Sequence, residues 1–274
     1  MGDWIQAAVV TLFVVALVWV GRRPVGSSEL SYFADRFSLN ADAMNVELVS
    51  ARLRRSRKVR SVAVALGITV GALPVYVNLI DRESASSFSN FFTSQAWLIG
   101  AAFGAMLAEL LVVQRPIRRG HAALVARRPA DYVAAGWSRL VISLALAAIV
   151  ATTTAVIARN PLWVRSVAGG IAAVVAVALM WVGLTTITNR PLLTPDGPLR
   201  TTDEALRAYG AHHIVGAGIA LAGGAASISL SPLVESAPAL EWLPLVVSLG
   251  SLGLWRVVAF HLQWEAGHPV MVPP

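Results

Sequence analysis

Long apolar stretches alternate with polar connections along the whole chain. An α-helix needs about 20 apolar residues to cross a hydrocarbon layer about 30 Å thick. Seven segments meet or approach this length, and we predict a transmembrane helix for each of residues 4–20, 61–80, 95–114, 140–158, 163–187, 213–230 and 242–262. A helix satisfies its own backbone hydrogen bonds in lipid. The pattern therefore predicts an all-α polytopic bundle of seven spans, with residues 1–274 forming one transmembrane domain.

The positively charged residues predict the orientation of this bundle. Three connections hold nine, six and three of the 22 Lys and Arg residues, and they cover residues 21–60, 115–139 and 188–212. The other positive residues are Arg82 and Arg159 in the remaining connections, Arg165 at the outer interface of the fifth span, and Arg256 within the last span. Because Lys and Arg accumulate in cytoplasmic loops, we predict that the N-terminus lies outside and the C-terminus in the cytoplasm. The first span is expected to remain as an uncleaved anchor, since Arg22 and Arg23 follow it.

Short helices are predicted in the cytosolic connections. Asn40 or Asp42 is a suitable N-cap for a helix that leads into the second span. The segment 28–37, which contains Phe33 and Phe37, is expected to lie at the membrane interface with its rings among the headgroups. Thr201 followed by Glu204 has the spacing of a capping box at the start of a further helix.

Composition supports a membrane location. Apolar residues make up 56% of the chain and charged residues 14%, against roughly a quarter charged in soluble domains. Mean hydropathy is +0.66. Lys58 is the single Lys beside many Arg, Ala and Val residues, which suggests GC-rich codons, and we therefore predict a bacterial cytoplasmic membrane. Cys is absent, so disulfides, thiolate metal sites and Cys nucleophiles are excluded.

The densest group of charges comes directly before the second span. We call it the basic cluster, and it comprises Arg52, Arg54, Arg55, Arg57, Lys58 and Arg60. Its expected partners are the anionic lipid headgroups of the inner face, and the alternative is a docking surface for a cytosolic protein. We do not expect nucleic acid as a partner, because the cluster has no interleaved aromatic residues.

Two ionisable residues fall inside predicted spans, where charge is costly. Glu109 precedes the end of the third span by five residues, and Arg256 precedes the end of the seventh by about six. Both lie at a similar depth, roughly 7–10 Å below the inner boundary. We hypothesise an ion pair between them. The alternative is that each side chain extends separately to the headgroups or water.

Other polar or unusual residues are interpreted as structural. Pro74 lies within the second span and is a candidate hinge, although a fixed bend is the simpler interpretation. His212, His213 and His261 gather near the inner ends of two spans, but too near the boundary for a haem or metal site to be expected. The small-residue patterns that begin at Gly67, Gly100 and Gly216 predict close packing of helices or contact with a second copy.

No recognised catalytic motif occurs. The sequence has no P-loop, no H-E-x-x-H zinc motif and no G-x-S-x-G elbow. We therefore expect no cofactor and no enzymatic activity. The favoured hypothesis is a transport-related permease or accessory subunit that works with a membrane or cytosolic partner. The alternative is a non-catalytic scaffold or assembly subunit of a larger membrane complex.

Overall fold

The structure is a computed structural model that describes residues 2–39, 44–80, 87–113, 127–190, 198–234 and 238–261. Every element within these ranges is a helix. The α-helices are α1 (Gly2–Gly21), α2 (Ser27–Arg36), α3 (Val46–Ile80), α4 (Ser87–Val113), α5 (Ala135–Ile157), α6 (Trp163–Asn189), α7 (Pro198–Val234) and α8 (Leu243–Arg256). Two short 3-10 helices, η1 (Pro129–Asp131) and η2 (Pro238–Leu240), precede α5 and α8, and the π-helix η3 (Val257–His261) continues α8. The predicted all-α fold is confirmed.

Four helical stretches of the described ranges are long and apolar enough to cross a membrane. They are Ala135–Ile157, Trp163–Asn189, Leu199–Val234 and Leu243–His261. Their positions agree with the last four predicted spans. Helices α1, α3 and α4 overlap the first three predicted spans, and α3 and α4 begin well before them; their passage through the membrane stays a prediction.

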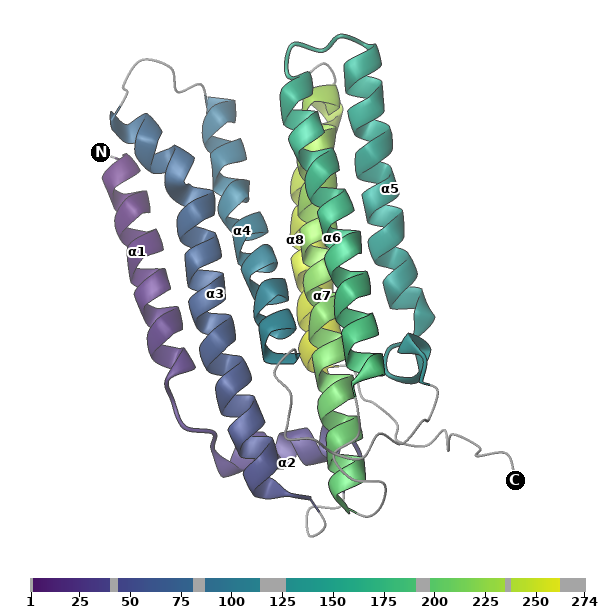
Figure 1. Cartoon of the computed structure of the whole chain (residues 1–274). Coiled ribbons are helices and arrows are strands. Elements are labelled where there is room, and N and C mark those ends of the chain that lie inside the picture. The colour runs from purple at the N-terminus through teal and green to yellow at the C-terminus, as the bar shows by residue number, and fades with distance from the viewer. Residues whose placement is uncertain are drawn as a thin grey trace.

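The long helices lie side by side in an antiparallel bundle (Figure 1). Helices α1, α4, α6 and α8 run toward the end at which α2 lies, and α3, α5 and α7 run away from it. We call this end of the bundle the α2 end. Helix α2 lies across it, at a steep angle to the other helices. All the candidate polar residues discussed below lie at or near this end.

Helix α7 occupies the centre of the bundle. In its most apolar stretch 94% of the residues are buried, against 28% in α5, 33% in α6 and 28% in α8 with η3. Helices α4, α5, α6 and α8 all pack against α7. Its sequence explains this position, because the stretch from Gly216 to Ala226 is mainly Gly and Ala, and small side chains allow neighbouring backbones to approach closely.

The predicted small-residue patterns act within the chain. A Cβ atom at Gly100 of α4 would overlap the carbonyl group of Gly67 of α3, and one at Gly104 would overlap that of Ala63. On α7, Gly216 faces Trp255 of α8, whereas Gly224 faces Ile99 of α4. The pattern on α7 thus serves two different neighbours, because helices surround α7.

The starts of two helices, α3 and α7, differ from the expectations. Helix α3 begins at Val46, and the side chain of Asn45 accepts the N–H of Leu48 at 2.8 Å, so Asn45 takes the capping role; Asn40 and Asp42 lie outside the described residues. The capping box at Thr201 and Glu204 is wrong, because α7 is already helical from Pro198. Helices α3 and α7 each continue without a break from the connection into the predicted span.

The segment 28–37 does not place its phenylalanines among headgroups. Phe33 and Phe37 are buried, and their ring centroids lie 5.9 Å and 6.3 Å from that of Tyr209 on α7. Tyr32 of the same segment is half exposed. The amphipathic pattern was interpreted as facing lipid, but the apolar face of α2 packs against the N-terminal part of α7.

Candidate functional site: a buried polar cluster at the α2 end

The first polar group surrounds Glu109 of α4, whose side chain is 2% exposed. Arg60 of α3 forms an ion pair with its carboxylate and donates from Nε to Oε1 at 2.9 Å. Ser56, one turn earlier on α3, donates to the same oxygen at 3.1 Å. Arg60 also donates to the hydroxyl of Tyr209 on α7 at 3.3 Å. The carboxylate therefore joins α3 to α4, and the guanidinium extends the contact to α7.

The hypothesised ion pair between Glu109 and Arg256 is wrong. Glu109 is paired with Arg60, and Arg256 is exposed at the last residue of α8. Equal depth in the membrane was the basis of the hypothesis, but depth does not determine which face of a helix carries a residue. Arg60 lies two turns before Gly67, on the face of α3 that contacts α4. This spacing could have indicated from the sequence that Arg60 faces Glu109.

The basic cluster does not form one continuous surface. Val49, Leu53 and Ser56 face inward at helical spacing, and Arg60 continues that face. Arg54 and Lys58 are exposed on the other side of α3. The remaining members are Arg57, which pairs with Glu29 of α2, Arg52, which donates to the carbonyl of Val112 at 2.6 Å, and the partly buried Arg55. The exposed members therefore lie on one face of α3, and the contact of this cluster with headgroups or a cytosolic protein stays a prediction.

Arg52 satisfies a carbonyl at the end of α4. The last carbonyls of a helix have no partner within it and carry a partial negative charge. Burial lowers the pKa of Arg52 to about 10, with a further lowering from the charge of Arg190. This value still leaves Arg52 protonated at neutral pH, so it can stabilise the helix end as a cation.

Helix α2 supplies equivalent contacts to the end of α8. Arg36 donates to the carbonyls of Ala259 at 2.8 Å and Val258 at 3.3 Å, and the Tyr32 hydroxyl donates to that of Phe260. These carbonyls belong to the π-helix η3. Burial lowers the pKa of Arg36 below its usual value. A cation from the N-terminal part of the chain thus caps the last described helix, which fixes α2 beneath the bundle.

The histidines do not form a metal site in the described part of the chain. His212 is 3.0 Å from Arg36 through its Nδ1 atom, and His213 packs edge-on between the rings of Tyr209 and Phe260. His261 is exposed. Among the described residues no group of three or more His, Asp or Glu side chains is placed to hold a metal ion. The Nε2 atom of His213 is buried with no hydrogen-bond partner in that part.

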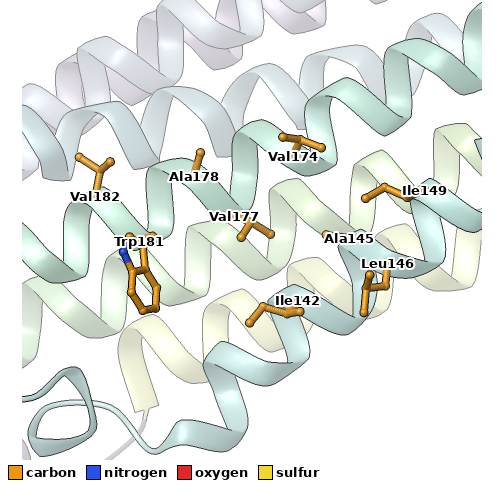
Figure 2. A pocket seen from close by; sticks show the side chains of 9 residues that line it. All are labelled: Ile142, Ala145, Leu146, Ile149, Val174, Val177, Ala178, Trp181 and Val182. Atoms are coloured by element: carbon orange, nitrogen blue, oxygen red, sulfur yellow. The ribbon is translucent and has the colours of Figure 1, made fainter.

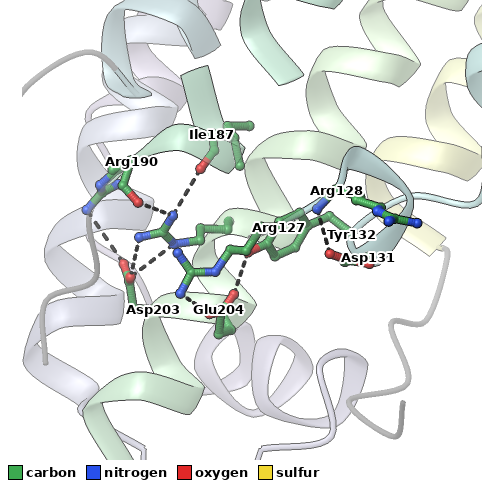
Figure 3. A network of polar contacts seen from close by, with 9 residues as sticks. Arg127, Arg128, Asp131, Tyr132, Ile187, Arg190, Asp203 and Glu204 are labelled. Carbon is green, nitrogen blue, oxygen red and sulfur yellow. Dashed lines mark hydrogen bonds and ion pairs between the residues drawn. The ribbon is translucent and has the colours of Figure 1, made fainter. Parts of the chain in front are cut away.

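A second network at the same end was not found from the sequence (Figure 3). Asp203 and Arg207 are an i, i+4 pair on α7, at 3.0 Å and 2.8 Å through Nε and one terminal nitrogen. Arg207 also donates to the carbonyls of Ile187 at 3.0 Å and Arg190 at 2.7 Å, where α6 ends. The i, i+4 spacing favours such a pair on a helix, but it did not indicate that the pair is buried.

The same network reaches the segment before α5. Glu204 pairs with Arg127 at 2.9 Å and accepts the hydroxyl of Tyr132 at 2.6 Å. Burial, followed by this hydrogen bond to Glu204, raises the pKa of Tyr132 above its usual value, so the phenol stays protonated and acts as donor. Glu204, predicted as half of a capping box, instead connects α7 to the η1 segment.

Pro74 lies inside α3, which remains helical on both sides of it as far as Ile80. Whether it acts as a hinge stays a prediction.

Taken together, the buried charges at the α2 end bind one another and the carbonyls of helix ends. This arrangement holds connections against the bundle, and we assign it a structural role.

No protein-family model matches the chain, and no curated protein or solved structure is detectably similar to it. The described residues therefore establish only the class of protein. It is a helical protein in which four described helices are long and apolar enough to cross a membrane.

Proposed function

We propose that this protein is a non-catalytic, seven-span subunit of a bacterial cytoplasmic membrane complex, which presents its α2 end to a partner in the cytosol. The observation that carries the proposal is the central position of α7. A helix that is almost entirely buried fills the axis of the bundle, and its glycines place it against α4 and α8. Such packing suits a rigid support better than a pathway for a polar substrate.

The seven-span topology is part of this proposal. Trp163 and Trp181 are both exposed on α6, and 18 residues of helix separate them by about 27 Å. Tryptophans gather at the two interfaces of a bilayer, so this spacing is consistent with a full crossing. The excess of Lys and Arg in the connections of the α2 end supports its placement in the cytosol.

Cysteine labelling tests the orientation, and the natural chain has no Cys to remove. Ser28 lies at the start of α2 and Arg159 follows α5 at the opposite end; both are exposed. In intact cells we expect an impermeant maleimide to label Arg159→Cys but not Ser28→Cys. Permeabilised cells should show both labelled, which controls for reactivity. Labelling of Ser28→Cys alone in intact cells would invert the topology and contradict the proposal.

Purification from the native membrane in mild detergent tests the partner. We expect a second protein to co-purify in fixed stoichiometry and to be lost in Arg54→Glu, which reverses an exposed charge at the α2 end. The matched control is Arg159→Glu, which reverses an exposed charge at the opposite end. Recovery of the wild-type chain alone, as a monomer, would count against a partner-dependent function.

A transport-related permease or accessory subunit is the second candidate. The grouping of helices favours it: α1, α3 and α4 form one set and α5 to α8 another (Figure 1). The two sets meet where α4 packs against α7 and where α2 contacts the end of α8. Two sets of helices that move against each other are a common basis of transport. A substrate-dependent change in the distance between labels on α3 and α6 would favour this candidate over a rigid support.

A further inference from the structure

An apolar groove runs along the outer face of the bundle between α5 and α6. It has a volume of about 530 Å³ and is lined by Ile142, Ala145, Leu146, Ile149, Val174, Val177, Ala178, Trp181 and Val182. Figure 2 shows that these side chains come from two adjacent helices and that the Trp181 indole lies at one end of the row. From Val174 to Val182 the groove is about 12 Å long. Its chemistry fits one hydrocarbon chain lying parallel to the helices.

The groove lies on a surface that the bundle leaves uncovered. Leu146 is 56% exposed and Trp181 61%. About two thirds of the apolar stretches of α5 and α6 are not buried inside the protein. Because these two helices are long and apolar enough to cross a membrane, we expect the acyl chains of the bilayer to surround the groove.

A positive charge lies at the α2 end of the groove. Arg139 precedes Ile142 by three residues on α5, so helical periodicity places it on the same face, about 4.5 Å nearer the α2 end. It is exposed and takes part in none of the ion pairs within the described residues. Trp181 lies at the same end of the groove, and an indole is favoured at the level of lipid headgroups. A hydrocarbon slot therefore ends beside an amphipathic ring and an exposed cation.

We infer that this groove binds an anionic phospholipid, with one acyl chain between α5 and α6 and the phosphate beside Arg139. Charge complementarity selects this occupant over a zwitterionic lipid, because a single cation near the membrane surface attracts anionic lipid. The inference shares with the proposed function the placement of α5 and α6 in the membrane, but it does not depend on a protein partner.

Lipid retention after extraction tests the site. The full-length protein is reconstituted in nanodiscs of equal parts phosphatidylglycerol and phosphatidylcholine with identical acyl chains, transferred to detergent, and examined by native mass spectrometry. We expect the wild type to retain phosphatidylglycerol in preference to phosphatidylcholine. Arg139→Gln should lower the retained phosphatidylglycerol about five-fold. Arg22→Gln removes an exposed cation that directly follows α1 at the same end and should leave retention unchanged.

A second pair of variants tests the groove itself. Ala178→Phe places a ring in the groove from an exposed position on α6, whereas Ala147→Phe adds the same ring to an exposed position of α5 that does not line it. We expect Ala178→Phe alone to abolish retention, with both variants eluting like the wild type. Equal retention of the two lipids, no effect of Arg139→Gln, or a dimer that Ala178→Phe disrupts would each overturn the inference, the last by showing that a second copy occupies the groove.

Discussion

Replacing Glu109 with Ala is expected to lower the free energy of unfolding by about 3–5 kcal/mol, because it leaves the charge of Arg60 buried without its partner. The carboxylate is 2% exposed and the Arg60 side chain 15%, so water compensates little. Ser56 also loses its acceptor. Unfolding of the purified protein in mixed micelles, followed by tryptophan fluorescence, measures the change.

A second ion pair, formed by an arginine on the same helix as Arg60, provides a matched control. Arg57 of α3 pairs with Glu29 of α2, but these side chains are 26% and 45% exposed. Glu29→Ala should therefore change stability by only a few tenths of a kcal/mol, as for other surface pairs. The double variant Arg60→Met with Glu109→Leu removes both buried charges and should recover most of the loss. Equal effects of Glu109→Ala and Glu29→Ala would contradict the buried pairing.

Replacing Gly100 with Ala is expected to separate α3 from α4 and to destabilise the protein by about 1–3 kcal/mol, the usual cost of overpacking. The added Cβ would overlap the carbonyl group of Gly67, which is backbone and cannot rotate away. Thermal unfolding in detergent reports the loss. The larger Gly100→Leu change should prevent assembly of the bundle, seen as aggregation on size-exclusion chromatography.

Gly253 of α8 provides the control for this prediction. Among the described residues, apart from its chain neighbours and the nearby backbone of its own helix, no heavy atom lies within 4 Å of the position that a Cβ would take there. In a helix Ala is favoured over Gly by up to about 1 kcal/mol, so Gly253→Ala should be neutral or slightly stabilising. A loss at Gly253 equal to that at Gly100 would show that glycine is needed for some reason other than the helix contact.

The periodicity and length of the apolar segments predicted correctly those features that depend on one segment alone. The positions of the apolar helices follow from runs of side chains that must avoid water, and the last four spans agree with helices that are long and apolar enough to cross. The glycine patterns at Gly67 and Gly100 also indicated close packing correctly. These features can be recognised in a single segment, without knowledge of its neighbours.

The polar cluster could be predicted only in part. The low abundance of charge in the spans correctly singled out Glu109 as unusual, yet its partner was assigned to α8 instead of α3. The basic cluster was treated as one surface, although helical spacing directs Arg60 inward and leaves Arg54 exposed. Asp203 and Arg207 were missed, since a charged pair ahead of a span resembles an ordinary solvated turn of helix.

The sequence by itself determined that this chain is helical, that much of it is apolar enough for a membrane, and which connections carry the positive charge. The tertiary structure decided which residues meet: Glu109 with Arg60, Arg36 with the end of α8, and α7 with neighbours on every side. Hydrophobicity acts on each segment separately and fixes its depth. Partners depend instead on the rotation of each helix about its axis, and that is set by how side chains of neighbouring helices fit together.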